Sequence, residues 1–124
     1  MKINRERDAG GPIIRGFTRT GFRLDEATVM NAVMLTVAQA QPWSPPPLQT
    51  LDEAALAAIL DPAPEFILIG TGQMLAHPPR ALVRSLEERG IGVEAMDSRA
   101  AAKAWGVLRG EGRQIAAALY PLDT

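Results

Sequence analysis

The first stretch whose residue types suggest chemistry is a glycine turn at residues 66–72, FILIGTG, which Pro78 and Pro79 follow. The four apolar residues predict a buried strand, and the prolines predict the start of a helix. Backbone N–H groups of a glycine turn at the head of a helix can hold a phosphate. The motifs G-x-G-x-x-G and G-x-x-x-x-G-K-[ST] are absent, and residues 71–76 separate the strand from the prolines. A ligand site and a structural corner therefore both stay open, and the missing motifs favour the corner.

A nucleophilic relay has one set of candidates in this sequence. His77 is the single histidine, and Thr71 with Glu94 or Asp97 would have to supply the nucleophile and the acid. Such a set would serve a hydrolase or a transferase. The spacing does not support it, because the G-x-S-x-G motif is missing. We assign no catalytic residue and lean against an enzyme, and the hydrolase or transferase is the alternative.

Further acidic residues lie near the ends of the later predicted elements, at Glu94, Asp97 and Glu111. Paired carboxylates can carry out acid–base chemistry. Asp97 has a simpler interpretation as the N-cap of the helix that follows it. Glu111 and Arg113 lie on either side of Gly112 and can form an exposed ion pair, which contributes at most ~1 kcal/mol.

Composition excludes several classes of function. The chain has 124 residues and no cysteine, which excludes disulfides, thiolate catalysis and Cys-ligated metals and fits a reducing cytoplasm. One histidine allows no two-histidine metal site, and we expect neither a metal nor a cofactor. The net charge of -1 argues against a nucleic-acid binder. No apolar run is long enough to span a membrane.

The N-terminal half predicts a polar lead-in followed by short strands. We expect residues 1–11 to be a flexible lead-in and residues 12–124 to form a single domain. Four prolines in residues 39–49 predict a loop, which Trp43 attaches to the body of the protein. Three strands are predicted around these features, at residues 12–18, 21–25 and 28–37.

The C-terminal half predicts alternating helices and strands. Thr50 and Glu53 have the spacing of a capping box and predict a helix over residues 51–60. Asp97 or Ser98 caps a later helix, which ends at Gly110. The remaining predicted elements are strands at 65–70, 91–96 and 113–121 and a helix from Pro78 or Pro79 to Gly90. Helical crossovers between strands make them parallel, so the sequence predicts an α/β fold with N-terminal antiparallel strands followed by a parallel β-α-β-α-β half.

Two stretches resemble a known family of small domains. They are ILIGTG at 67–72 and LEERGIGVEAMDSRAAAKAWGVLRGEGRQIAAAL at 86–119, and residues 12–45 resemble it more loosely. The family includes the mitochondrial complex I assembly factor 3 and an adipogenesis-associated protein. The resemblance implies a single three-layer α/β domain with a mixed central sheet and no established enzymatic activity. This chain departs from the family at residues 103–106, KAWG, where polar side chains that might line a site are replaced.

These observations predict a non-catalytic binding or assembly domain. Its cleft would lie where the ends of parallel strands bring the glycine turn and the acidic helix entry to one rim. Trp105 is expected in the core, although Gly106 beside it indicates a close approach by a strand or a partner. The occupant would be a protein segment or a small ligand, and a homo-oligomer is compatible with either. The resemblance adds assistance in the assembly of a membrane-associated complex. The predicted cleft residues are Gly70, Thr71, Gly72, Asp97, Trp105, Glu111 and Arg113.

Overall fold

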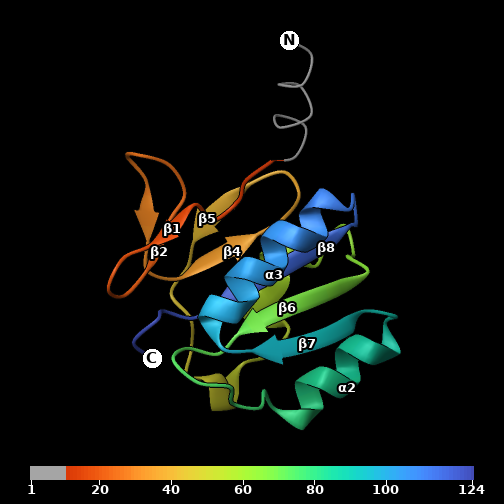
Figure 1. Ribbon diagram of the computed structural model, residues 1–124. Coiled ribbons are helices and arrows are strands. Elements are labelled where there is room, and N and C mark those ends of the chain that lie inside the picture. The colour runs from red at the N-terminus through yellow and green to blue at the C-terminus, as the bar shows by residue number, and fades with distance from the viewer. Residues whose placement is uncertain (1–10) are drawn as a thin grey trace.

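The computed structural model describes residues 11–124, which form three layers around a five-stranded sheet (Figure 1). The sheet consists of β4 (Val33–Leu35), β5 (Ala40–Pro42), β6 (Phe66–Gly70), β7 (Gly92–Met96) and β8 (Ile115–Leu119). The strand order is β5-β4-β8-β6-β7. On one face lie α3 (Ser98–Gly110) and a small N-terminal sheet, and on the other lies α2 (Arg80–Glu88).

The strand directions confirm the predicted mixed sheet. β6 is parallel to both of its neighbours, with Ile67 opposite Val93 of β7 and opposite Ala116 of β8. β4 is antiparallel to β8 and to β5. Because β6 and β7 run side by side in the same direction, their carboxyl ends meet at one edge of the sheet. Residues 1–10 of the predicted lead-in lie outside the described residues, so the division into a lead-in and one domain stays a prediction.

The predicted strand over residues 28–37 is divided between two sheets. Its first part is β3 (Val29–Met30), which joins β1 (Gly16–Phe17) and β2 (Phe22–Arg23) in an antiparallel three-stranded sheet. Its second part is β4 of the central sheet. The chain changes direction at Asn31, whose Oδ1 accepts a hydrogen bond from Thr20 Oγ1 at 3.0 Å. A continuous strand is therefore wrong here, because the chain crosses from one sheet to the other.

The predicted proline loop over residues 39–49 contains a strand at its start. β5 pairs with β4 and places Pro42 opposite Val33. Proline is compatible with an edge strand, because its missing N–H is not needed by a further neighbour. After β5 the chain continues without regular structure to a short 3₁₀ turn, η1 (Leu48–Thr50).

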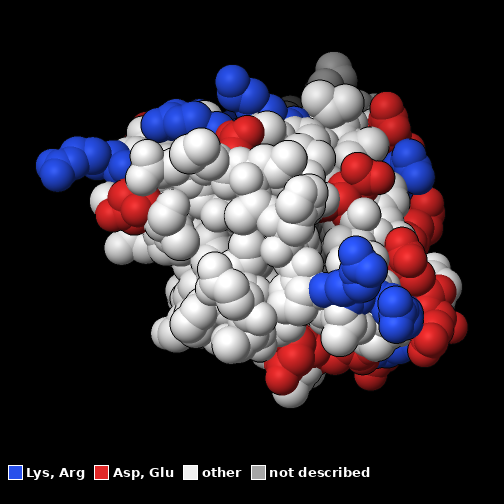
Figure 2. Space-filling view, turned by 90° about the horizontal axis from the view of Figure 1, so that it is seen from below, with Lys and Arg blue, Asp and Glu red and all other residues white. Residues whose placement is uncertain are grey.

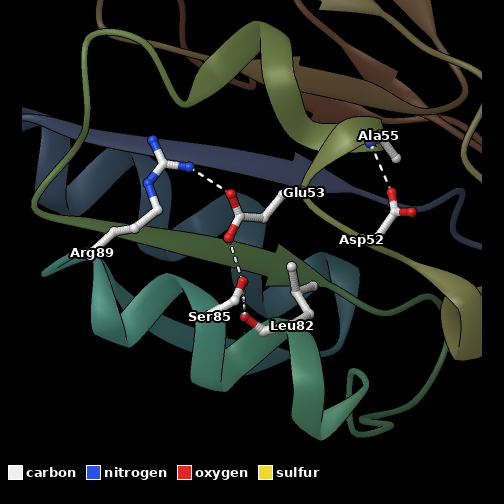
Figure 3. A network of polar contacts seen from close by, with 6 residues as sticks. All are labelled: Asp52, Glu53, Ala55, Leu82, Ser85 and Arg89. Carbon is white, nitrogen blue, oxygen red and sulfur yellow. Dashed lines mark hydrogen bonds and ion pairs between the residues drawn. The ribbon is translucent and has the colours of Figure 1, made fainter.

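The predicted helix over residues 51–60 forms only a 3₁₀ helix, η2 (Ala54–Ile59), and its capping box is wrong. Thr50 Oγ1 donates to the carbonyl of Pro47, and Asp52 Oδ1 accepts the N–H of Ala55 at 3.0 Å instead. Glu53 turns away toward α2, as Figure 3 shows. The tertiary contact thus replaces the local capping bond.

The contacts of Glu53 join η2 to α2. Its carboxylate accepts hydrogen bonds from the Ser85 hydroxyl and from Arg89 Nη1, the latter at 2.6 Å. The hydrogen bond from Ser85 has the largest effect in lowering the pKa of Glu53 below its ordinary value, and the bond from Arg89 lowers it further. The pair holds the 51–60 segment against the helix that follows β6 (Figure 3).

The helix that covers the other face begins as predicted. Asp97 is the N-cap of α3, and its Oδ2 accepts the N–H of Ala100 at 3.0 Å. Apolar residues alternate along β8, so Ile115, Ala117 and Leu119 face α3 while Ala116 and Ala118 face α2 and η2. The sheet therefore has a buried core on each side, as its continuous apolar strands predict.

Candidate functional site

The glycine turn is a buried corner whose backbone groups already have partners. Ser98 Oγ accepts the N–H of Gly72 and donates to the carbonyl of Tyr120, both at 2.8 Å, and the Ser98 N–H donates to the Gly72 carbonyl at 2.8 Å. Ser98 is fully buried. At Gly70 an added Cβ would lie 2.9 Å from Ser98 Oγ and from Leu119 Cδ2. The turn therefore joins β6, α3 and β8 rather than presenting the Gly72 amide to a phosphate.

The candidate relay around Thr71 is not assembled. The Thr71 hydroxyl donates to the Met74 carbonyl at 2.7 Å and accepts the N–H of Ala76 at 3.0 Å. His77 is exposed, and within residues 11–124 it forms no hydrogen bond or ion pair with a carboxylate. A general base must lie within hydrogen-bond reach of the proton that it removes. Thr71 instead shapes the loop that follows β6.

A groove of about 800 Å³ opens beside Thr71, between the 71–76 loop and the proline segment. We call it the neutral groove, because no Asp, Glu, Lys or Arg lines it. Met74 and Leu75 are 75% and 55% exposed, so two large apolar residues stand open to solvent beside the cavity. Figure 2 shows a broad uncharged region on this side of the molecule, with charged side chains around it. The neutral groove is lined by Pro45, Pro46, Pro47, Leu48, Gln49, Thr71, Gln73, Met74, Leu75, Ala76, Tyr120, Pro121 and Thr124.

Aromatic side chains hold the proline wall of the neutral groove in place. The Tyr120 hydroxyl donates to the Pro46 carbonyl at 2.7 Å. The Trp43 ring meets the Tyr120 ring edge-on, with 5.5 Å between centroids, and Trp43 Nε1 donates to the Leu119 carbonyl at 3.3 Å. Burial raises the pKa of Tyr120 to about 12, so its hydroxyl remains a donor at alkaline pH values where an exposed tyrosine would ionise. The predicted attachment of the proline loop by Trp43 is confirmed.

The remaining predicted cleft residues do not line the neutral groove. Asp97 lies with Gly72 in a smaller polar hollow of about 370 Å³, next to the neutral groove. Trp105 is fully buried, and its Nε1 donates to the Pro12 carbonyl at 3.0 Å, so it belongs to the core. Gly106 has nothing within 4 Å of an added Cβ, so no close approach explains it.

Glu111 and Arg113 lie at the opposite end of the sheet from the glycine turn. α3 begins where the parallel strands have their carboxyl ends and runs back to the end of the sheet where these strands begin. Its 13 residues span about 20 Å. Arg113 Nη1 lies 3.9 Å from Glu111 Oε1, and Arg113 Nη2 lies 3.3 Å from Glu65 Oε1. All three side chains are exposed, so these are surface ion pairs. The structure therefore brings together Gly70, Thr71, Gly72 and Asp97 but not all seven predicted residues.

Apart from Thr71, sequence reasoning missed the residues that form the neutral groove. The available signals were the run Pro45–Pro47 close to Trp43 and the apolar pair Met74–Leu75 in a loop. Within the described part of the chain, no three His, Asp or Glu side chains come close enough together to hold a metal ion. None of the helices at residues 11–124 has the length and apolar character needed to cross a bilayer.

A protein-family comparison matches residues 14–120, which is most of the chain and both of its sheets. The matching family is described as "Protein of unknown function (DUF498/DUF598)". The chain belongs to this family. The resemblance noted in the sequence is thereby confirmed, and it extends over the N-terminal strands as well as the β-α-β-α-β half.

Relatives include both bacterial and vertebrate proteins. An uncharacterized protein of Rhodobacter capsulatus is 32% identical over 92% of this chain and 88% of its own length. NADH dehydrogenase [ubiquinone] 1 alpha subcomplex assembly factor 3 of Danio rerio is 25% identical over 98% of this chain. The chain spans 71% of that protein and 60% of its human counterpart, which is 28% identical.

A solved structure supports the same architecture. The NMR structure of a Xanthomonas campestris protein has a TM-score of 0.78 and 30% sequence identity. It covers 96% of this chain and 91% of its own. The fold of this chain is therefore shared with an experimentally determined structure.

Proposed function

We propose that this chain is a non-catalytic assembly domain, which holds an apolar segment of a protein partner in the neutral groove during the assembly of a membrane-associated respiratory complex. The observation that carries the proposal is the groove of about 800 Å³ without a charged side chain in its lining, beside the exposed residues Met74 and Leu75. The names of the vertebrate relatives supply the process.

The chemistry of the groove favours an apolar occupant. A charged side chain would lose hydration there and find no oppositely charged side chain in the lining, which makes its burial costly. Apolar side chains would instead bury against Met74, Leu75 and the prolines, at about 25 cal/mol per Å² of apolar surface removed from water. Methionine adapts its shape to different partners. Subunits of a membrane-bound complex carry long apolar segments of this kind before insertion.

The contacts of Thr71 support a binding role over the hydrolase or transferase alternative. Its hydroxyl is bound within the loop, and the exposed His77 has no acidic partner in the described residues. A cytoplasmic location goes with the proposal as an expectation, and cell fractionation tests it.

The proposal is tested in the organism that carries the gene. Deletion should reduce the amount of fully assembled NADH dehydrogenase on a native gel, and the unchanged gene should restore it. The double variant Met74→Asp, Leu75→Asp should fail to restore assembly, because it places charges at the groove. Val107→Asp is the matched control, because Val107 is also an exposed apolar residue, 65% accessible, on the outer side of α3.

Two results would contradict the proposal. One is normal assembly of the complex in the deletion strain. The other is full restoration by the double variant. Failure of the double variant supports the proposal when the purified variant unfolds at the same temperature as the parent chain.

A further inference from the structure

β7 forms one edge of the central sheet, as Figure 1 shows, and pairs only with β6. Two backbone hydrogen bonds show which residues of β7 turn their N–H and C=O groups toward β6. The Gly92 N–H donates to the Glu65 carbonyl at 3.0 Å, and the Met96 carbonyl accepts the N–H of Thr71 at 2.9 Å. Alternate residues of a strand turn their backbone groups to the same side. Gly92, Glu94 and Met96 therefore bond toward β6.

The intervening residues, Val93 and Ala95, turn their N–H and C=O groups toward the free edge. No residue within 11–124 hydrogen-bonds to these groups. Both residues stay partly exposed although their side chains turn toward α2, so the helix does not close the edge. An unpaired edge of this kind can accept an additional strand from another chain.

A second groove, of about 570 Å³, lies beside this edge on the α3 side. It exists because α3 lies mainly over β6 and β8 and leaves β7 largely uncovered (Figure 1). Gly92 has no side chain, which leaves space beside Phe66. We call this groove the edge groove, and its apolar lining consists of Phe66, Leu68, Val93, Met96, Ala104 and Leu108. Its charged lining residues are Glu94 and the surface ion pair of Glu65 with Arg113.

Glu94 gives the edge its charge preference. It is exposed at the middle of β7 and lies level with Leu68, on the face that borders the edge groove. No cation of the described chain lies within ion-pair distance of its carboxylate. Opposite charges on directly facing residues of neighbouring strands stabilise the pair, and like charges destabilise it.

This charge disfavours a second copy of the chain as the occupant. Two β7 strands paired antiparallel about a twofold axis at Glu94 would place Glu94 opposite Glu94 of the other copy, in the register that pairs Val93 with Ala95. A strand with a basic residue opposite Glu94 would instead place opposite charges next to each other, which stabilises the pair.

We propose that the free edge of β7 binds an extended segment of another protein that carries Lys or Arg opposite Glu94. The residues two positions before and after this basic residue are apolar, because the side-chain period of a strand places them on the same face, over the edge groove. Backbone bonds to Val93 and Ala95 hold the segment, and the Glu94 pair sets its register. This surface is separate from the neutral groove, so its occupancy does not rest on the assembly function.

A library of random peptides of about 12 residues, displayed on phage, tests the proposal, since this length spans β7 with a margin on each side. Selection on the purified chain should enrich peptides with a basic residue flanked by apolar residues at positions -2 and +2. An enriched peptide should bind the Glu94→Lys variant at least ~10-fold more weakly, because like charges then face each other. Glu26→Lys is the matched control, an exposed acid outside the central sheet, and should leave the affinity unchanged.

A second variant and a second measurement locate the peptide. Ala95→Pro removes an outward N–H without removing a bond to β6, and it should abolish binding. In the parent chain, the bound peptide should slow amide hydrogen exchange at Val93 and Ala95. The Met74→Asp, Leu75→Asp variant should bind the peptide as tightly as the parent chain does, which keeps this test distinct from that of the neutral groove.

Three outcomes would overturn the proposal. The first is a selection that enriches no basic residue between apolar ones. The second is an affinity that Glu94→Lys leaves unchanged. The third is sedimentation showing a dimer that Glu94→Lys disrupts, since that would make a second copy the occupant.

Discussion

Replacement of Ser98 by alanine should destabilise the protein strongly, because this hydroxyl is the contact that joins three elements. Ser98 Oγ is 2.8 Å from both the Gly72 nitrogen and the Tyr120 carbonyl oxygen, and the residue is fully buried. In Ser98→Ala the Gly72 N–H loses its partner, and the space left by one oxygen is closed off from solvent. The substitution removes no apolar surface, so its cost comes from the lost hydrogen bonds.

The magnitude follows from the two groups that are left without a partner. A buried N–H without a partner costs about 1–3 kcal/mol, and the Tyr120 carbonyl adds about 1 kcal/mol. We therefore expect a loss of about 2–4 kcal/mol in the free energy of unfolding. Domains of this size have a total of about 5–15 kcal/mol, so the variant should remain folded but lose a large share of its stability.

Urea unfolding, followed by the fluorescence of Trp43 and Trp105, measures this loss. The midpoint should shift while the slope m stays the same, because the unfolded surface does not change. Ser44→Ala is the matched control, since Ser44 is exposed, and it should change stability by less than about 0.5 kcal/mol. If Ser98→Ala also lost less than about 0.5 kcal/mol, the argument that Ser98 holds the glycine corner would be refuted.

Three further predictions concern other parts of the fold. Gly106→Ala should stabilise α3 by about 1 kcal/mol in urea unfolding, because the added Cβ meets nothing within 4 Å and alanine favours a helix interior; destabilisation would show a hidden contact. The absorbance titration of Tyr120, the single tyrosine, should have its midpoint at about 12 in the folded protein and near 10 in urea. Since this folded pKa is raised, its contribution to stability is complete below about pH 10 and is lost as the pH rises through about 12, and equal midpoints would contradict the burial of the hydroxyl. The folded pKa of Glu53 is lowered, so its contribution to stability is present above its unfolded pKa and is lost as the pH falls through the folded value. In Glu53→Gln, the free energy of unfolding in urea should therefore fall less between pH 7 and pH 3 than it does in the parent chain. An unchanged acid dependence would contradict the role of Ser85 and Arg89.

The sequence predicted the C-terminal half of the fold because its signals are local. The apolar run before Gly70 and the run at residues 91–96 are long enough to identify buried strands. Asp97 caps α3 through a bond to an N–H three residues away, which is a contact that spacing alone can reveal. Parallel directions then follow from the helical crossovers.

Two of the predictions that the structure corrected involve a choice between a local and a distant partner. Glu53 has the spacing of a capping box, yet its carboxylate binds Ser85 and Arg89 of α2. The 28–37 segment has the composition of one strand, yet its two parts join different sheets. Such choices depend on which other elements lie within reach, and sequence spacing does not contain that information.

The sequence by itself thus determined the class of fold, the order of elements in the parallel half and the absence of the standard phosphate and nucleophile motifs, because each of these is a property of neighbouring residues. Only the tertiary structure decided where surfaces lie. It placed Glu111 and Arg113 about one helix length from the glycine turn, and it closed that turn with the buried hydroxyl of Ser98. It also brought Pro45–Pro47 and the 71–76 loop together into a groove. The physical reason is that a groove needs two walls, and here they are separated by more than 20 residues that form two 3₁₀ segments and a strand.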